Sequence, residues 1–233
     1  MDFSNGAGSR ESTSRPIRSF VLRSGRMSSA QKRSYENLFS RYAIKGGEGA
    51  IESSSIFDNN GPLIIEIGFG MGRATADIAL KNPGNNYLGI EVHRPGIGRL
   101  LWEIEKESIS NLRIIEGDAV EILKRRICDS TVSAFHIFFP DPWPKKKHHK
   151  RRLITRPFTD LLAAKLCPGG YLYMVSDWAD YGHWALKELG ETPGLVNKYE
   201  SFAESQKWRP ETEFERKGCQ KNNKINELFF VKI

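Results

Sequence analysis

Apolar and polar residues follow one another along this chain in a repeated order of strand, turn and helix. From Gly61 onward, continuous apolar runs predict strands at 63–67, 86–91, 112–116, 134–139 and 171–176. The segments between them carry apolar residues at helical spacing and predict helices at 73–81, 97–104, 118–127 and 158–166. Apolar strands that alternate with helices are typical of a mostly parallel sheet covered by helices on both faces, which is an α/β fold. We expect the C-terminal run at 227–233 to close the sheet, either at its edge or inserted within it.

The same pattern divides the chain into three parts. Residues 1–16 hold almost no apolar side chains and predict a disordered basic arm. Residues 17–60 predict an N-terminal basic extension, helical from Ser29 with four aromatic or leucine residues at helical spacing, followed by a Gly/Ser-rich linker. Residues 61–233 then form the α/β domain.

Positive charge is concentrated in two segments. The chain of 233 residues carries 35 Lys and Arg against 28 Asp and Glu, a net charge of +7. Residues 1–45 hold nine basic residues against three acidic ones, and residues 145–156 hold seven basic residues and no acid. Positive charge concentrated in this way favours a polyanionic partner such as RNA over a neutral small molecule.

The cysteines and the hydropathy pattern indicate where in the cell the protein is located. Three well-separated cysteines, Cys128, Cys167 and Cys219, form no CxxC pair and suggest neither a disulfide framework nor a zinc ribbon. No apolar run approaches the roughly 18 residues of a membrane span, and the N-terminus lacks the apolar core of a signal peptide. We therefore expect a cytoplasmic protein that does not enter a membrane.

An acidic residue stands at or just after the end of each of the five predicted strands. In chain order these are Glu66, Glu91, Asp118, Asp141 and Asp177. In open parallel sheets, ligands bind outside the carboxyl ends of the strands. The sequence therefore predicts that the five carboxylates gather at one edge of the sheet around a ligand.

The first strand runs into a glycine loop, EIGFGMG, with glycines at Gly68, Gly70 and Gly72. This spacing differs from the GxGxxG dinucleotide fingerprint. A tighter loop preceded by an acid suits a ligand with an amino acid group and no phosphate, and S-adenosylmethionine is such a ligand. Glu66 within its apolar run needs a cationic or hydrogen-bonding partner, for which the methionine ammonium is a candidate. A purely structural turn is the alternative.

The next two acids suit the adenosine part of the same ligand. Glu91 ends its strand at the place where an acid typically accepts both ribose hydroxyls. Asp118, after Gly117, can receive the adenine amino group, although Asp118 with Glu121 also matches a helix capping box.

The stretch FFPDPWPKKKHHKRR, at 138–152, combines a stiff acid with a run of cations. Prolines on both sides restrict the backbone around Asp141, and Trp143 offers an aromatic face suited to stacking a base. The cations that follow suit phosphate contacts, and the alternatives are a solvated face or a localisation signal. These cations are Lys145, Lys146, Lys147, Lys150, Arg151 and Arg152.

A further polar segment, RPETEFERKG at 209–218, carries Thr212, Glu213, Phe214 and Glu215. On composition alone it is a surface turn. Guanine, however, presents two adjacent donors that one carboxylate, such as Glu215 or Asp177, can accept.

Taken together, RSFVLRSGR, LIIEIGFGMG, YLGIEVH, GDA, FFPDPWPKKKHHKRRL, SDW and RPETEFERKG resemble the tRNA (guanine-N7-)-methyltransferase family from about Arg18 to Ile233. The resemblance implies a Rossmann-like class I methyltransferase fold with a seven-stranded sheet. It also implies methyl transfer from S-adenosylmethionine to N7 of guanine 46 in the variable loop of tRNA. Only residues 1–16 and the linker at 45–60 carry no family motif.

The resemblance also assigns the site residues. The family's cofactor acids fall on Glu66, Glu91, Asp118 and Asp141, and its substrate contacts on Lys145, Asp177 and 212–215. We expect Asp141 to stabilise the positive charge that develops on the purine. The alternatives are a non-catalytic RNA-binding protein, or a methyltransferase acting on another RNA or on a small molecule. Adjacent His148 and His149 do not suit one metal ion, so no metal is expected.

Overall fold

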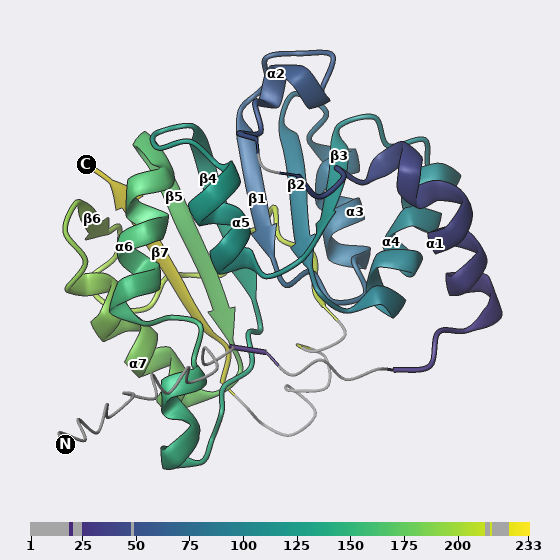
Figure 1. The fold of residues 1–233 in the computed structure, drawn as a ribbon. Helices are drawn as coiled ribbons and strands as arrows, with labels where there is room; N and C mark the ends of the chain where they lie inside the picture. The colour runs from purple at the N-terminus through teal and green to yellow at the C-terminus, as the bar shows by residue number, and fades with distance from the viewer. Residues whose placement is uncertain (1–18, 21–24, 48, 213–214, 216–223) are drawn as a thin grey trace, which may run out of the picture.

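The computed structural model describes residues 19–20, 25–47, 49–212, 215 and 224–233. Its helices are α1 (Ser29–Tyr42), α2 (Ser53–Ile56), α3 (Arg73–Lys81), α4 (Arg94–Lys106), α5 (Ala119–Arg126), the 3₁₀ helix η1 (Lys146–Arg151), α6 (Arg156–Lys165) and α7 (Ala179–Gly190). Its strands are β1 (Leu63–Ile67), β2 (Asn86–Glu91), β3 (Leu112–Glu116), β4 (Val132–Phe138), β5 (Leu166–Ser176), β6 (Leu195–Asn197) and β7 (Asn226–Lys232). Figure 1 shows these elements as one sheet between two helical layers.

The sheet has seven strands in the order β3-β2-β1-β4-β5-β7-β6. The first five strands of this order pair in parallel, while β7 runs antiparallel to both β5 and β6. The chain order reverses between β1 and β4, which is the switch point where parallel sheets of this kind bind their ligands. The predicted α/β fold with a mostly parallel sheet is confirmed.

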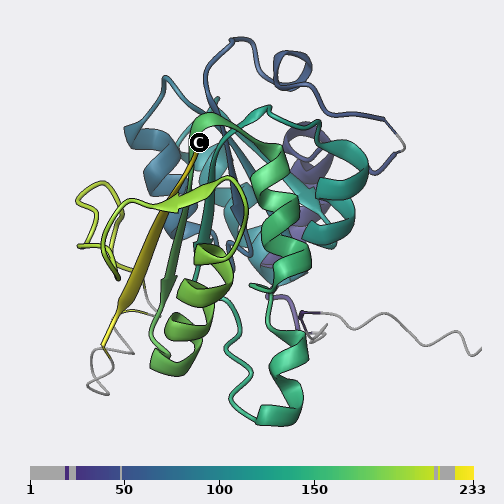
Figure 2. The same ribbon diagram turned by 90° about the vertical axis from the view of Figure 1, so that its left-hand side faces the viewer.

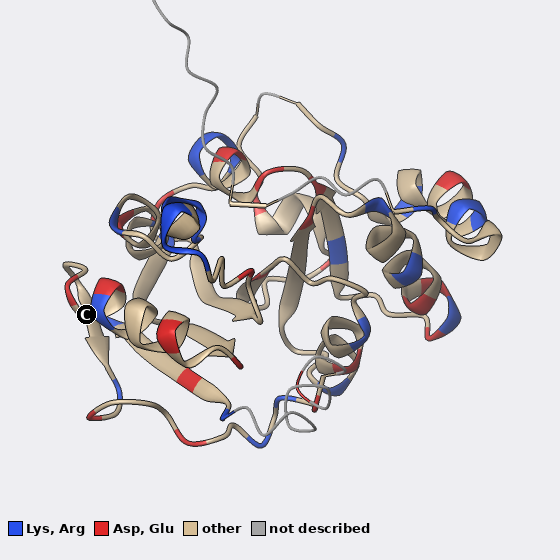
Figure 3. Cartoon of the chain, turned by 90° about the horizontal axis from the view of Figure 1, so that it is seen from below, with Lys and Arg blue, Asp and Glu red and all other residues tan. Residues whose placement is uncertain are grey.

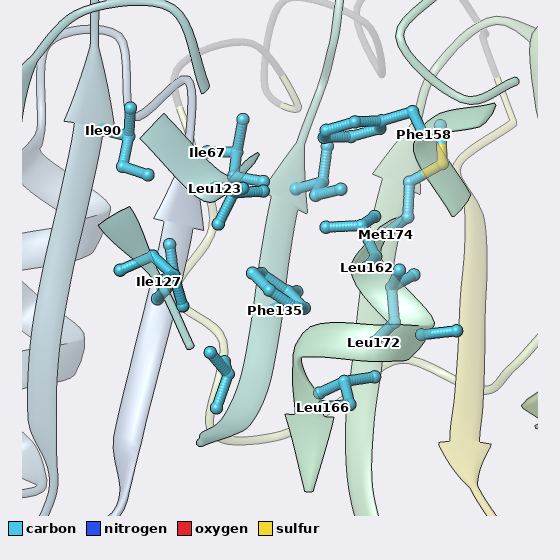
Figure 4. Packing of buried hydrophobic residues seen from close by; sticks show 14 of the residues in the cluster. Ile67, Ile90, Leu123, Ile127, Phe135, Phe158, Leu162, Leu166, Leu172 and Met174 are labelled. Carbon is cyan, nitrogen blue, oxygen red and sulfur yellow. The ribbon is translucent and has the colours of Figure 1, made fainter. Parts of the chain in front are cut away.

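Each face of the sheet buries its own apolar layer. One layer packs β1, β4 and β5 against α5, α6 and α7, and Figure 4 shows its centre around Phe135, with Leu123 and Leu162 of the helices against it. The other layer packs α3 and α4 against the opposite face through residues such as Ile78 and Leu101. Because both faces are covered, the strands are apolar throughout, as the sequence pattern indicated.

The strand predictions are most accurate in the first half of the chain. The predicted bounds 63–67, 86–91 and 112–116 match β1, β2 and β3, and the predicted helix at 73–81 matches α3. The prediction for β5 was wrong at its start, because Leu166 to Gly170 belong to the strand rather than to the end of α6. Gly169 adopts a φ of +78° where the pairing of β4 with β5 shifts register, so Pro168-Gly169-Gly170 forms an irregular strand start.

The C-terminal strand is inserted within the sheet. β7 lies between β5 and β6, so β6 forms the edge. The sequence left the edge and inserted positions open, and three-residue β6 was not predicted. Pairing of Tyr173 with Phe229 across β5 and β7 brings the end of the chain next to the strand whose tip carries Asp177.

The N-terminal helix packs on the domain that follows it. Ser28 caps α1 in a capping box with Gln31, and the helix lies along α4, as Figure 1 shows on the right. Gly98 permits this approach, since a Cβ there would lie 2.4 Å from the carbonyl oxygen of Gln31. The helix predicted from Ser29 is confirmed.

Candidate functional site

The glycine loop between β1 and α3 depends on backbone conformations that favour glycine. Gly68, Gly70 and Gly72 have φ values of +76°, +58° and +73°. The space around a Cβ at Gly68 or Gly70 is open to 4 Å, whereas at Gly72 it would lie 2.6 Å from Leu100. The first two glycines therefore leave room beside the loop, and the third allows the loop to pack on α4.

Glu66 lies within β1, just before this loop. Its side chain is buried with 4% of the residue exposed, and it lines a cavity beside the glycines. Burial, together with the nearby negative charge of Glu91, raises the pKa of Glu66 to about 8, while the neighbouring Thr75 hydroxyl acts in the opposite direction. Without a ligand this carboxyl is mostly protonated at neutral pH, and a cationic partner would lower its pKa again.

Glu91 at the end of β2 holds two turns together. One carboxylate oxygen accepts the N–H of Gly70 at 2.9 Å, and the other accepts the N–H groups of Val92 at 2.6 Å and His93 at 3.0 Å. The side chain thus fixes the glycine loop against the start of α4. Its remaining lone pairs can still accept hydroxyl donors, because an ionised carboxylate offers about four acceptor positions.

A cavity of about 860 Å³ connects the glycine loop with segments far away in the sequence. Its walls include Glu66 and the three glycines, Ser34 of α1, Phe139 after β4, and Thr212. The predicted cofactor loop and part of the predicted substrate segment therefore face one shared space. Such a pocket is large enough for a cofactor and the edge of a substrate.

Asp118 lies at the mouth of a second cavity, of about 790 Å³, which is lined by Gly117 and by Lys150 and Arg151. The Asp118 side chain accepts the Val120 N–H at 2.9 Å and caps α5, without the reciprocal Glu121 contact of the capping box weighed from the sequence. Because Asp118 also lines this cavity, the cap and a ligand contact are compatible.

The loop that carries Asp141 is strained on both sides of the acid. Phe139 and Trp143 adopt φ values of +50° and +45°, which bulky residues rarely do, and each precedes a proline. Asp141 itself is exposed just beyond the end of β4. Backbone strain of this kind persists where the surroundings hold the chain firmly, and it often occurs at functional sites.

Arg152 provides that hold, and the prediction that it contacts tRNA phosphates was wrong. Its side chain is fully buried, with Nε donating to the Pro142 carbonyl oxygen at 3.0 Å and Nη2 donating to Asp180 of α7. The guanidinium also lies 5.1 Å from the ring centres of Tyr181 and Trp184. Arg152 therefore ties the Asp141 loop to α7 and does not face solvent.

The other cations of the run are placed for an external partner. Lys145, Lys146, Lys147 and Lys150 are exposed, and η1 projects beyond the strand ends, as Figure 2 shows at the bottom of the molecule. Figure 3 shows Lys and Arg gathered on this helix. Arg151 lies 4.9 Å from the centre of the Trp143 ring.

Trp143 differs from the sequence prediction. Its indole N–H donates to the Ser19 carbonyl oxygen at 3.0 Å, and Arg151 covers its ring. Trp143 therefore joins the N-terminal extension to the Asp141 loop, and Arg151 occupies one side of its ring.

The segment after Trp208 reaches the first cavity through Thr212. Glu215 does not point at this space as an independent acceptor, because both its oxygens bind Arg209, at 2.5 and 2.9 Å. The Thr212 hydroxyl accepts the Glu215 N–H at 3.1 Å. Glu213 and Phe214, also predicted as substrate contacts, lie outside the described residues.

Asp177 is half-buried directly after β5, at the same edge of the sheet as Asp141 and the glycine loop. The five acids thus stand at the strand ends in the predicted order. Glu66 and Glu91 adjoin the glycine loop, Asp118 adjoins the second cavity, and Asp141 and Asp177 follow β4 and β5.

Two residues of the site were missed by the sequence reasoning. Gly96 of α4 lies against the glycine loop, since a Cβ there would be 1.8 Å from the Gly70 carbonyl oxygen. Arg209 anchors the Thr212 segment. A glycine two residues after Arg94 at a helix start was a detectable signal for close approach, whereas nothing local distinguishes Arg209 from a surface arginine.

The described residues offer neither a metal site nor a membrane-spanning helix. In this part of the chain, no group of three or more His, Cys, Asp or Glu side chains is placed to hold a metal ion. Among the helices that the structure describes, none combines the length and apolar character needed to cross a bilayer.

Comparisons with solved structures place the fold among methyltransferases. A 16S rRNA methyltransferase, KamB, aligns with a TM-score of 0.58 at 14% identity, covering 77% of this chain and 91% of its own. A 30S ribosomal A1408 methyltransferase from an uncultured bacterium aligns with a TM-score of 0.51 at 16% identity, covering 78% and 95%. At these identities the likeness concerns the fold alone, which is the class I methyltransferase fold.

Sequence comparisons are more specific. The methyltransferase family model Methyltransf_4 matches residues 60–228. A tRNA (guanine-N(7)-)-methyltransferase of Treponema pallidum (strain Nichols) is 47% identical, covering 94% of this chain and 96% of its own. One of Nitrosospira multiformis is 44% identical, covering 94% and 95%. This chain therefore belongs to the tRNA (guanine-N(7)-)-methyltransferase family.

Proposed function

We propose that this protein transfers a methyl group from S-adenosylmethionine to N7 of a guanine in tRNA, at position 46 of the variable loop. The observation that carries the proposal is the cavity of about 860 Å³, whose walls combine Glu66 and the glycine loop with Phe139 and Thr212. A donor and an acceptor must meet in one enclosed space for transfer to occur. The names of the relatives supply the substrate class.

The residues at the glycine loop fit the methionine end of the cofactor. Glu66 would receive the ammonium group, and Gly68 and Gly70 leave the space through which the chain of the ligand would pass. Thr75 supports this fit, since its buried hydroxyl lies near Glu66 and lowers the pKa of that carboxyl, which favours the ionised form that an ammonium group would pair with.

The adenosine end fits between β2 and β3. Glu91 would accept the ribose hydroxyls with the lone pairs that the backbone leaves, and Asp118 would accept the adenine amino group at the second cavity. Both carboxylates are already oriented by backbone N–H groups. Because they are fixed before binding, little ordering is required of them when the ligand arrives.

When bound, S-adenosylmethionine supplies an electrophilic methyl group on a sulfonium. Guanine N7 is an acceptor without a proton, so the protein needs no general base before attack. The chain's own contribution is to align the base and to stabilise charge. Asp141, held by strained backbone and by Arg152 through Pro142, would face the purine as it becomes positive.

The substrate would reach the site along the cations of η1. Lys146, Lys147, Lys150 and Arg151 would contact phosphates, while Lys145, Asp177 and residues 212–214 would contact the guanine. We assign transfer to the domain at 61–233, with 17–60 as an extension that contributes α1 to the cavity wall. A cytoplasmic location belongs to the same proposal.

The test is methylation of bulk tRNA with labelled cofactor, followed by mapping of the modified nucleotide. Label at N7 of guanine 46 is the expected result. Label on another nucleotide would overturn the position, and label on RNA other than tRNA would overturn the substrate. Binding of tRNA without any transfer would favour a non-catalytic RNA-binding protein.

A further inference from the structure

The segment that brings Thr212 to the cavity is anchored on a buried cluster of charges. Arg209 lies at its centre with a side chain 2% exposed. Its guanidinium binds Glu215 through two nitrogens, binds Glu227 of β7 at 2.9 Å, and donates from Nε to the Tyr173 hydroxyl at 3.2 Å. Tyr173 in turn donates to Glu227. One arginine thus joins β5, β7 and the loop between β6 and β7.

A buried cluster of charges is not the arrangement expected where a loop segment only has to be stable. A buried ion pair is seldom more stabilising than well-packed apolar side chains, because each charge must leave water. Burial opposes the charged form of Glu215, yet the Arg209 guanidinium holds the pKa of that carboxyl below its usual range. Such clusters are best explained where they fix one geometry among several.

An aromatic anchor reinforces the same segment. Trp208 stacks on His136 of β4 with ring centres 4.7 Å apart and lies 5.2 Å from the Tyr173 ring. The chain is therefore held at two successive residues that are separated from Thr212 by only two residues. Within three residues of Arg209 it reaches the cavity that also contains Glu66 and the glycine loop.

From this arrangement we propose that Arg209 is a positioning residue, which holds the Thr212 segment against the site where the guanine is bound. Glu215 serves this role as the partner of Arg209, and the base is read by other acceptors. The proposal rests on the proposed function for the identity of the substrate. The contacts that define the cluster do not depend on it.

The first measurement compares an effect on tRNA with an effect on binding of S-adenosylhomocysteine. Arg209→Met is expected to raise the KM for tRNA by about tenfold, equal to about 1.4 kcal/mol, while the Kd for S-adenosylhomocysteine from titration calorimetry changes less than about twofold. Arg209→Lys keeps the charge but not the planar fork, and it should recover part of the loss. The control is Lys165→Met, which breaks the pair between buried Lys165 and exposed Asp129 at the opposite end of β5.

A double variant tests whether Glu215 acts through Arg209. If it does, Arg209→Met combined with Glu215→Gln should be no worse than Arg209→Met alone, because both changes break one interaction. Additive losses in KM would show that Glu215 contacts the base itself. Equal losses of tRNA and cofactor binding, or a KM change no larger than in Lys165→Met, would overturn the positioning role.

An independent readout keeps the proposal testable if the wild-type protein does not methylate tRNA. Amide hydrogen exchange of the unliganded protein should become faster at 208–212 in Arg209→Lys, with the glycine loop unchanged. Unchanged exchange at 208–212 would refute the proposal without reference to any substrate. A wild-type protein inactive on tRNA, with the expected exchange change, would instead refute only the proposed function.

Discussion

The two halves of the site are built in different ways. On the side of β1 and β2, backbone groups dominate, as glycines at positive φ and the N–H groups of Gly70, Val92 and His93 fix the loop and its acid. On the side of β4 and β5, two buried arginines hold the chain. Arg152 ties the Asp141 loop to α7, and Arg209 ties the Thr212 segment to β7.

The two sides differ in how far apart in the sequence their interacting residues lie. The proposed cofactor side joins residues within about one supersecondary unit, since Glu91 and Gly70 are 21 positions apart. The proposed substrate side joins residues up to 124 positions apart, as in the bond from Trp143 to Ser19. We expect the first side to be preformed by its backbone, and the second to depend on individual side chains.

The largest expected effect is on the substrate side, at Asp141. Asp141→Asn removes the fixed negative charge, so kcat should fall by roughly 100- to 1,000-fold, by analogy with removal of one charge-stabilising group. The tRNA Kd should stay within about twofold. Single-turnover methylation and filter binding measure the two quantities, with Asp160→Asn on α6 as a control. If Asp141→Asn turns over at the wild-type rate, Asp141 does not take part in the reaction.

Arg152 and Arg151 are adjacent and should behave differently. Arg152→Met leaves the Pro142 carbonyl and Asp180 without their partner, so the free energy of unfolding should fall by roughly 1–3 kcal/mol and kcat should fall with it. Arg151→Met should weaken tRNA binding with little change in stability. Urea unfolding and tRNA titration compare them, and equal effects on stability would contradict the buried tether.

Two glycines of the loop offer a comparison on the cofactor side. Gly72→Ala places a Cβ 2.6 Å from Leu100, so it should destabilise the fold by roughly 1–3 kcal/mol. Gly68→Ala meets no atom within 4 Å and should cost about 1–2 kcal/mol for its left-handed conformation, while cofactor affinity falls further. Thermal unfolding with and without S-adenosylhomocysteine separates them. A cofactor loss larger for Gly72→Ala would place the ligand elsewhere.

The raised pKa of Glu66 predicts a pH-dependent effect on stability. Burial, with Glu91 nearby, raises this pKa from 4.5 to about 8, so the folded state binds the proton more tightly than the unfolded state. Stability of the unliganded protein should therefore decline as pH rises from about 4.5 to about 8, and Glu66→Gln should remove this decline.

Cofactor affinity should also depend on the protonation of Glu66, but it should rise with pH where stability falls. An ammonium partner needs the ionised carboxylate, so affinity should rise as pH increases toward about 8, with proton release near neutral pH. Calorimetry in buffers of different ionisation enthalpy measures the protons released. If the wild type releases no protons on binding, or if Glu66→Gln releases as many as the wild type, Glu66 does not bind the ammonium group.

The smallest effects are expected from single exposed lysines. Changing Lys146 or Lys147 to Gln should weaken tRNA binding a few-fold and reduce the slope of log affinity against log salt by about one unit per lost phosphate contact. Lys198→Gln, near β6, is the control. An unchanged slope after both changes would show that η1 does not lie along the RNA backbone.

The sequence alone determined the parallel part of the sheet and the glycine loop at its edge. The bounds of β1, β2 and β3 follow from continuous apolar runs, and the glycine loop follows from a local need for positive φ. These features depend on burial and on backbone sterics over short stretches, which a linear sequence states directly. The order of acids at the strand ends followed from the parallel topology.

Only the tertiary structure decided what individual side chains on the substrate side do. The same basic run contains exposed Lys147 and fully buried Arg152, and nothing in their neighbours distinguishes them. Arg209 became an anchor because β7 inserts beside β5 and brings Glu227 to it. Charge is a property of a residue, but its partner and its access to water are properties of packing between distant segments.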